Sequence, residues 1–348
     1  MQPNKKYQIS DSFDETSWRR FLKNNPRSNI FHTPEMFEVF NRTKGYTPQR
    51  MAVLDSQANI QAISFPVLVS LKEGVLRKAT TRAIHYGGLL YEDHQESLEC
   101  LRLLLPHCLK SSGNDALFTE LRHLADPADI DSILNENRLE YEIHLNYLVN
   151  LNRPVDEVWK HISSEARGAV KRSQKRGLVI EEMSDISQVS EFYQLLKTTY
   201  DRKRIPLIDI SHFEAIFDIL VPMNMAKMYR AKVEDQPIAG FIVFLYNKTI
   251  YWWYSGDNFN FRKYYPTDGI IWHVLEWGCQ ENYTCFDVGW AGRPDEPYGV
   301  RKFKEKYGGQ QVTYGRHRYI HAPMLMHMST MGYNIYRILT KIFRKNTV

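Results

Sequence analysis

The feature that most constrains this chain is a duplicated pattern of hydrophobic segments. Residues 51–69 (MAVLDSQANIQAISFPVLV) and residues 229–245 (YRAKVEDQPIAGFIVFL) each hold two apolar stretches separated by a short polar segment. Such a pair of stretches predicts an antiparallel β-hairpin. Helical and extended patterns surround both hairpins in the same order, so the sequence predicts two copies of one α/β unit.

The order of elements is the same in both halves: helices, a three-strand meander, then helix, strand, helix and strand. In the second half the helical spacing covers 155–166, 186–202, 211–220, 268–281 and 298–307, and the strand patterns cover 226–234, 237–247, 249–255, 283–289 and 311–320. In the first half helices are expected over 12–24, 34–43, 94–110 and 128–137, with strands over 49–54, 60–70, 78–86, 116–122 and 141–149.

This order resembles the acetyltransferase-like (GNAT) fold. We therefore expect an α/β (α+β) protein with two tandem GNAT-like domains, each a mixed, mostly antiparallel sheet flanked by helices. The expected domains are 1–150 and 151–320, followed by a helical tail at 321–348. A length of 348 residues is sufficient for two domains with a core each.

Several classes of protein are disfavoured by the sequence. It contains no run of about 18 uncharged apolar residues, so no bilayer-spanning helix is expected. The first residues lack the apolar region of a secretory signal. The four cysteines lie far apart and show no metal-ligand spacing, so we expect reduced thiols, no metal and a cytoplasmic protein.

Charge is distributed unevenly along the chain. Residues 1–150 contain 17 basic and 19 acidic residues, whereas residues 151–348 contain 28 basic and 21 acidic residues. The basic second half favours an anionic partner, either a nucleotide, a phosphosugar, RNA or lipid head groups.

A candidate anion site lies where a strand gives way to a helix, at residues 264–269 (YYPTDG). Unpaired backbone N–H groups at such a helix start attract phosphates. Thr267, Asp268 and Gly269 are therefore our candidate cofactor-binding residues. The pyrophosphate loop R/Q-x-x-G-x-G/A that is typical of acetyl-CoA enzymes is absent.

Several short segments, in this order and at this spacing, make the chain similar to Fem-type transferases from about residue 28 to residue 320. These segments are 30–34 (IFHTP), 85–88 (HYGG), 167–177 (RGAVKRSQKRG), 199–202 (TYDR), 286–289 (FDVG) and 303–309 (FKEKYGG). The family's phosphate-gripping lysine after the first helix has no match, because residues 40–42 read FNR. Its aspartate near residue 120 is absent as well, because residues 119–123 read TELRH.

The resemblance implies transfer of an activated acyl or aminoacyl group to an amine of a peptidoglycan or other cell-wall precursor. It implies no tightly bound cofactor. The donor is acyl-CoA or aminoacyl-tRNA, and the acceptor is a small-molecule or lipid-linked glycan. The alternative is a non-catalytic protein that binds RNA or anionic glycan on a transferase-like scaffold.

Three basic residues are candidates for substrate binding. Arg167 and Lys171 belong to a run of five cations with helical spacing, which either contacts phosphates or forms a solvated helix face. Arg202 matches the family position that contacts substrate phosphate, and a guanidinium suits bidentate phosphate recognition. Its alternative role is an ion pair with a neighbouring acid.

Two residues are candidate catalytic groups. Asp287 follows an apolar strand, so its carboxylate is expected at the end of the sheet, where it serves either as a base or as a turn residue beside Gly289. Tyr254 ends an aromatic strand, and its phenol is a candidate proton donor to the leaving group. Simple alternation predicts that Trp252 and Tyr254 share one face of the sheet.

Aromatic and basic residues near the C-terminus complete the candidate binding set. Trp290 lies in a glycine-containing loop and is expected to stack on substrate. Phe303 and Lys304 match the family's F-K pair, where the resemblance implies docking of the tRNA acceptor end. The segment after residue 320 is apolar on one face and basic near its end, so it either packs on the first domain or lies on the inner face of the membrane.

Overall fold

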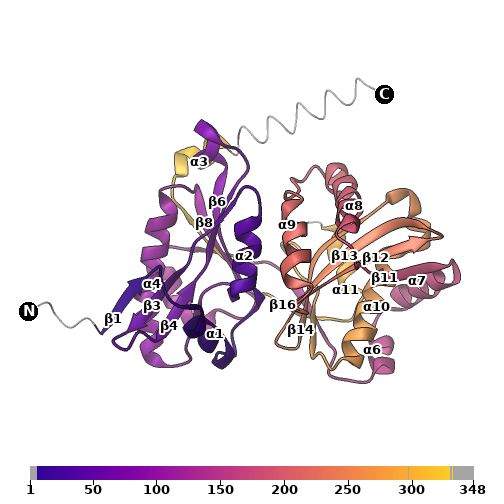
Figure 1. Cartoon of the computed structure of the whole chain (residues 1–348), viewed down its shortest axis with the longest axis horizontal. Helices are drawn as coiled ribbons and strands as arrows, with labels where there is room; N and C mark the ends of the chain where they lie inside the picture. The colour runs from indigo at the N-terminus through magenta and orange to yellow at the C-terminus, as the bar shows by residue number, and fades with distance from the viewer. Residues whose placement is uncertain (1–5, 297, 330, 332–348) are drawn as a thin grey trace, which may run out of the picture. The chain divides into compact units, whose positions relative to one another are not determined.

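The computed structural model describes residues 6–296, 298–329 and 331, and these residues form two compact units (Figure 1). Within the described residues, the first unit contains the chain up to Asn41, Gly45–Glu142 and the chain from Arg316 onward. The second unit contains Arg42–Lys44 and Ile143–Gly315.

The first unit contains two sheets. One has the order β1 (Tyr7–Ser10), β3 (Met51–Asp55), β4 (Ile60–Ser64) and β7 (Leu90–Tyr91). The other has the order β2 (Tyr46–Pro48), β5 (Pro66–Ser70), β6 (Thr81–Tyr86), β8 (Phe118–Arg122), β17 (Arg316–Ile320) and β9 (Glu140–Glu142). Strands β6 and β8 are parallel.

The helices of the first unit cover these sheets through apolar faces. They are α1 (Glu15–Asn24), α2 (Pro34–Arg42), α3 (Arg77–Thr80), α4 (Gln95–Gly113) and α5 (Asp131–Glu136), with 3-10 turns at Ile30–His32, Gly74–Leu76 and Ala128–Ile130. In α4 the residues Leu101, Leu104, Leu105 and Cys108 recur at helical spacing and are fully buried against Val53 and its neighbours.

The second unit is built on one seven-stranded sheet. Its order is β11 (Leu178–Glu182), β12 (Ala226–Val233), β13 (Gln236–Tyr246), β14 (Thr249–Asp257), β15 (Cys285–Asp287), β10 (Asn146–Asn150) and β16 (Gln310–Val312). The only parallel neighbours in this sheet are β14 and β15. The expected α/β class with mixed, mostly antiparallel sheets is confirmed.

Helices cover both faces of this sheet. The helices α6 (Val155–His161), α7 (Ser164–Lys175) and α10 (Pro266–Gln280) pack on the face that carries Phe241 and Val243. The helices α8 (Ser187–Lys203) and α9 (Ser211–Ala215) pack on the opposite face, where Phe192 of α8 reaches Gly240. A π turn at Ile216–Leu220, a 3-10 turn at Phe259–Tyr264 and α11 (Gly299–Glu305) complete the unit.

Each unit contains one strand from the other half of the sequence. Strand β10 lies between β15 and β16 in the second unit, and β17 lies between β8 and β9 in the first. The strand expected over 60–70 is wrong as a single strand, because β4 ends at Ser64 in one sheet and β5 begins at Pro66 in the other. The patterns at 141–149 and 311–320 also predict one strand each, but each is two strands in two sheets. A break accompanies each division: residues 143–145 separate β9 from β10, and residues 313–315, with Gly315 at φ +66°, separate β16 from β17. The observed units therefore differ from the expected domains by one strand in each direction.

The C-terminal segment is described only in part. Its residues 323–329 are helical, and the Ser329 hydroxyl donates a hydrogen bond of 3.0 Å to the Ala79 carbonyl within the first unit. The expected tail at 321–348 extends beyond this helix, and its residues 332–348 lie outside the described part of the chain.

Candidate active site

The parallel pairing of β14 with β15 ends in the middle of β14. The last paired residues are Tyr251 and Asp287, whereas β14 continues to Asp257 beside β13. Beyond Asp287 the regular strand ends, and a loop whose backbone still bonds Leu145 and Tyr147 leads to α11. The two candidate catalytic residues and three of the candidate binding residues lie on four elements: the end of β15, the second half of β14, the C-terminus of α8 and helix α11.

A β-bulge at Trp253 changes which side chains share a face. Ile242 pairs with Tyr254 and Val243 pairs with Trp252, so Trp253 is the extra residue of the bulge. The rings of Trp253 and Tyr254 both contact His212 of α9, with centroid distances of 6.1 and 6.3 Å. Trp252 instead contacts Phe241 on the opposite face, at 4.8 Å.

The prediction that Trp252 and Tyr254 share a face is therefore wrong, because the extra residue of the bulge interrupts the alternation. Residues paired across neighbouring strands point to the same face, which places Asp287 with Tyr251. The bulge moves Tyr254 to that face as well. The two candidate catalytic residues consequently lie on one face of the sheet.

Asp287 is buried at the end of β15. Its Oδ1 accepts hydrogen bonds from Asn146 Nδ2 at 2.7 Å and from the Gly289 backbone N–H at 2.8 Å. Burial raises the pKa of this carboxyl above its ordinary value, while the two hydrogen bonds and Lys304 act in the opposite direction. The side chain is only 3% exposed. Its bond to Gly289 is the turn interaction that we expected as the alternative to a role as a base.

Lys304 is a buried cation that holds the loop after β15. Its Nζ donates to the Val288 carbonyl at 2.6 Å and to the Trp290 carbonyl at 2.9 Å, and it lies 4.7 Å from the centre of the Trp252 ring. Burial lowers the pKa of this ammonium to about 7; Asp287 opposes the shift, and Lys203 adds to it. Lys304 is therefore close to its titration point at neutral pH.

Phe303 lies in α11 beside Lys304, in a cluster of rings. It makes edge contacts with Trp252 at 6.4 Å and with Tyr307 at 5.6 Å. The Lys306 ammonium lies 4.2 Å from the centre of the Phe303 ring. One face of the ring is thus covered by a cation of the protein itself, whereas the sequence predicts a ring that is open for stacking.

Arg202 lies at the C-terminal end of α8, and this end is hydrogen-bonded to the end of β14. The Thr199 hydroxyl bonds both the backbone N–H and the carbonyl of Asp257, at 3.0 and 3.1 Å. The Arg202 guanidinium is 3.6 Å from the Asp257 carboxylate and 4.7 Å from the centre of the Phe259 ring. The ion pair with a neighbouring acid is therefore present, and the guanidinium remains partly exposed.

The candidate cofactor residues begin α10. Asp268 is buried, and its Oδ1 accepts hydrogen bonds from Tyr307 Oη at 2.9 Å and Lys306 Nζ at 2.5 Å. A Cβ at Gly269 would lie 2.6 Å from Leu178 Cδ2, so this glycine allows close packing against β11. Thr267 is the partly exposed member of the three. The negative charge of Asp268 already occupies the helix start where an anion is predicted.

The basic residues of α7 have different roles. Arg167 donates to the carbonyls of Trp159, Lys160 and Ile162 and thereby caps the C-terminus of α6. Arg172 and Arg176 lie over the Tyr265 ring, at 4.5 and 5.6 Å from its centre. Lys171 is exposed. The helix therefore combines a structural cap with a cationic surface beside the start of α10.

Trp290 lies in the loop after β15, where it is 46% exposed. Its ring contacts Tyr298 at 5.4 Å and His144 at 5.7 Å. This exposed position is consistent with the stacking role that the sequence predicts.

Several residues at this site are not predicted from the sequence. Asn146, which bonds Asp287, lies in the first half of the chain and reaches the site only through the strand exchange. Lys203 lowers the pKa of Lys304. Its position directly after Arg202 is the signal in the sequence that could have identified it. Lys306 belongs to the charged segment around Phe303, but its bond to Asp268 required the tertiary structure.

Chemically, this arrangement combines a buried carboxyl of raised pKa with a buried amine of lowered pKa. Such shifted groups are typical of sites that hold or transfer protons near neutral pH. Among the described residues no cluster of histidine, cysteine or carboxylate side chains could hold a metal ion. In the same part of the chain, no helix is long and apolar enough to cross a membrane.

Comparisons with known proteins identify the fold. Residues 160–300 match the family model described as an acetyltransferase (GNAT) domain. The crystal structure of FemX is 16% identical in sequence, with a TM-score of 0.69, and the match covers 92% of this chain and 99% of FemX. No curated protein matches the chain in sequence.

Two further structures share the architecture. L-PGS from Bacillus licheniformis is 13% identical, with a TM-score of 0.59 over 93% of this chain and 98% of that one. A tandem GNAT protein from the clavulanic acid biosynthesis pathway is 9% identical, with a TM-score of 0.53 over 90% and 98%. At these identities the likeness establishes the fold alone. Together with the GNAT family model it confirms the expected resemblance to Fem-like acyltransferases.

Proposed function

We propose that the protein transfers an acyl or aminoacyl group to an amine, on the premise that residues 160–300 match the acetyltransferase (GNAT) family model and that the chain is similar in fold to FemX. The acceptor in this proposal is a cell-envelope glycan or glycopeptide precursor, such as a peptidoglycan precursor, or a lipid-linked form of one. The reaction takes place in the cytoplasm, with acyl-CoA or aminoacyl-tRNA as donor.

The observation that carries this proposal is the group of buried polar side chains where β15 ends. Asp287 and Lys304 have pKa values shifted towards neutrality, and Tyr254 lies on the same face as Asp287. No activated serine or cysteine is part of the group, so we infer direct attack by the acceptor amine on the donor carbonyl.

In the proposed reaction the amine nitrogen forms a bond to the carbonyl carbon, and the thioester or ester bond to the leaving group breaks. Asp287, directly or through water, takes the proton that the amine loses. Tyr254 donates a proton to the departing sulfur or oxygen. The charge on Lys304 stabilises the oxyanion that forms in between.

A comparison of the two units supports assigning the reaction to the second unit. In the first unit the corresponding parallel pair, β6 and β8, ends at Tyr86 and Arg122. There the chain turns away at Gly87 and Gly88, both at φ near +80°, and enters the other sheet. The first unit therefore has an arginine at the position of Asp287, and its strand does not continue past the end of the pair.

Donor phosphates are proposed to bind beside the start of α10. Asp268 makes the helix start itself unfavourable for a pyrophosphate, so we place the phosphates against Thr267 and the Arg172 and Arg176 guanidiniums over Tyr265. Arg202 and Lys171 are proposed as further contacts for substrate phosphates. Trp290, Phe303 and Lys304 are proposed to contact the reacting end of the donor or the acceptor.

The test is calorimetric titration with acetyl-CoA and, separately, with a stable aminoacyl-tRNA analogue, followed by turnover with the donor that binds. Saturable binding of acetyl-CoA assigns an acyl-CoA donor. Binding of the tRNA analogue that is weakened by Lys304→Ala assigns an aminoacyl-tRNA donor. If neither donor binds, the transferase proposal is refuted.

The alternative, a non-catalytic binder of RNA or anionic glycan, rests on a specific surface feature. Arg202 and Arg262 both lie over Phe259, at 4.7 and 4.5 Å, which is an arrangement suited to single-stranded nucleic acid. Such a binder would lose affinity steeply as salt rises and would show no turnover with either donor.

A further inference from the structure

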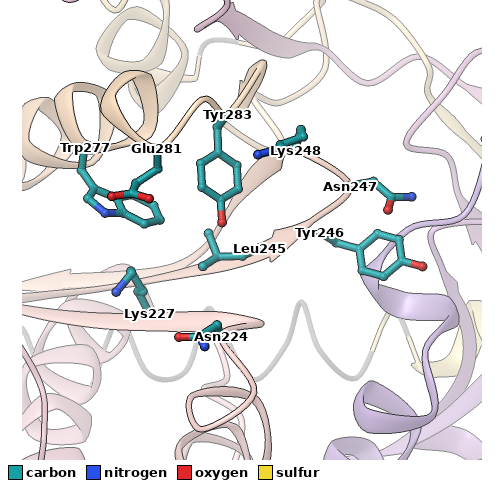
Figure 2. A pocket seen from close by; sticks show the side chains of 9 residues that line it. All are labelled: Asn224, Lys227, Leu245, Tyr246, Asn247, Lys248, Trp277, Glu281 and Tyr283. Carbon is teal, nitrogen blue, oxygen red and sulfur yellow. The ribbon is translucent and has the colours of Figure 1, made fainter.

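The second unit contains an open pocket of about 590 Å³ at the end of β14 opposite to the candidate active site (Figure 2). This volume lies within the ~300–1,000 Å³ range of small-molecule sites. None of the candidate catalytic or binding residues lines it. Its lining residues are Asn224, Lys227, Leu245, Tyr246, Asn247, Lys248, Trp277, Glu281 and Tyr283.

The backbone around the pocket is held together by hydrogen bonds between separate turns. The Leu245 N–H donates to the Met225 carbonyl at 2.8 Å. The Thr284 N–H and hydroxyl donate to the Lys248 carbonyl, at 2.8 and 3.2 Å. The loop before β12, the β13–β14 turn and the turn after α10 are thereby linked, so the walls of the pocket are preformed.

Lys248 occupies a position where glycine is favoured. Asn247 and Lys248 form the two-residue turn between β13 and β14, and their φ angles are +44° and +59°. Turns of this type favour Asn-Gly, because a side chain at a positive φ is strained. The lysine is thus kept at a conformational cost, and its ammonium lies 5.8 Å from the centre of the Tyr283 ring.

Two aromatic rings form the apolar wall of the pocket. Trp277 near the end of α10 and Tyr283 in the following turn have ring centroids 5.2 Å apart and planes inclined by 41°. Figure 2 shows both rings above the strands that carry Leu245 and Lys227. Lys227 lies 5.1 Å from the Trp277 ring and forms an ion pair with Glu182 at 2.6 Å.

These groups define the chemistry of a ligand. The lysines and the exposed Glu281 carboxylate make the rim unfavourable for a lipid tail. Glu281, and the pairing of Lys227 with Glu182, make it unfavourable for a polyphosphate. A pyranose ring fits both parts of the pocket, because its C–H face packs on an aromatic ring and its hydroxyls hydrogen-bond to ammonium and carboxylate groups.

We propose that this pocket is a carbohydrate-binding site, in which one pyranose residue stacks on Trp277 and Tyr283 and its hydroxyls bond to Lys248 and Glu281. The site is separate from the transfer reaction and does not depend on its donor. It would hold a distal sugar of a glycan chain while the chemistry takes place elsewhere, or bind a glycan without any transfer.

The experiment is isothermal titration of the full-length protein with N,N′,N″-triacetylchitotriose and with maltotriose. We expect at least one of them to bind at one site per chain. Trp277→Ala should weaken this binding about tenfold or more, whereas Tyr283→Phe should retain most of it. Met223→Ala is the matched control, because Met223 is 51% exposed in the loop that leads to Asn224 but does not line the pocket.

Lys248→Gly separates binding from folding. Glycine relieves the strain at the turn, so this variant should unfold at the same or a higher temperature than the wild type while its sugar affinity falls. The proposal is overturned if neither trisaccharide binds, or if Trp277→Ala and Lys248→Gly bind as tightly as Met223→Ala. Failure of sugar binding in a protein that turns over a donor would refute this site and leave the proposed function intact.

Discussion

Lys304 Nζ lies 2.6 Å from the Val288 carbonyl oxygen although the lysine is only 8% exposed. A cation is thus buried in the loop that follows the catalytic candidate Asp287. Burial of a lysine is costly for the charged form, which explains why the pKa of Lys304 is lowered from 10.5 to about 7.

This lowered pKa predicts how stability depends on pH. Between about pH 7 and 10.5 the unfolded chain keeps a proton on Lys304 that the folded chain releases, so raising the pH stabilises the fold. From pH 7 to 9 the gain from this residue is about 2 kcal/mol. Urea unfolding at several pH values gives the free energy of unfolding as a function of pH. Between pH 7 and 9 this free energy should rise more steeply for the wild type than for Lys304→Met, and an equal rise in both proteins would contradict the prediction.

Asp287→Asn tests the proposed base. The amide can still accept hydrogen bonds from Asn146 and Gly289, so the fold should be retained, but it cannot take up the proton of the attacking amine. We expect turnover to fall by about 10²–10⁴-fold with an unchanged melting temperature. Full turnover in this variant would exclude a catalytic role for the carboxylate.

Because His212 is buried, we expect the second unit to lose stability in acid. The Trp253 indole donates to its Nε2 at 3.1 Å, so its proton is on Nδ1, which lies 3.0 Å from the Thr43 hydroxyl. Burial lowers the pKa of His212 to about 3, so the unfolded chain takes up a proton below pH 6.5 that the folded chain does not. Acidification from pH 7 to 5 should cost about 2 kcal/mol at this residue.

The measurement for His212 is chemical unfolding at pH 7 and at pH 5. His212→Gln should lose less stability between the two pH values than the wild type does. An equal loss in both proteins would show that other groups account for the acid sensitivity.

Gly256 lies where α8 closely approaches β14. A Cβ at this position would lie 2.8 Å from Leu196 Cα, which is backbone and cannot move without shifting the helix. Gly256→Ala should therefore destabilise the protein by about 1–3 kcal/mol and displace Arg202 from Asp257. Gly299→Ala is the control, because nothing lies within 4 Å of its added Cβ. Equal melting temperatures for the two variants would contradict this packing.

We expect the C-terminal segment to bind anionic membranes. Met324 and Met328 are 85% and 66% exposed, and the sequence that follows contains several basic residues. Deletion of residues 325–348 should abolish flotation with vesicles that contain an anionic lipid and should not alter the behaviour with zwitterionic vesicles. Unchanged flotation after the deletion would rule out this membrane contact.

The sequence alone determined most of the local structure. The alternating and helical patterns predicted the hairpin at 229–245, the β3–β4 part of the hairpin at 51–69 and the long helices, because such patterns reflect which side of an element is buried. The order of the elements supported the resemblance to Fem-type transferases, which the fold confirms. It also directed attention to Asp287, Phe303 and Lys304.

Only the tertiary structure decided which strands pair and where several side chains point. The exchange of β10 and β17 brings Asn146 to Asp287, and the bulge at Trp253 moves Tyr254 to the face of Asp287. Arg167 caps α6 instead of facing solvent. Each of these outcomes depends on contacts between residues far apart in the chain, which compete with local preferences and leave no periodic signal in the sequence.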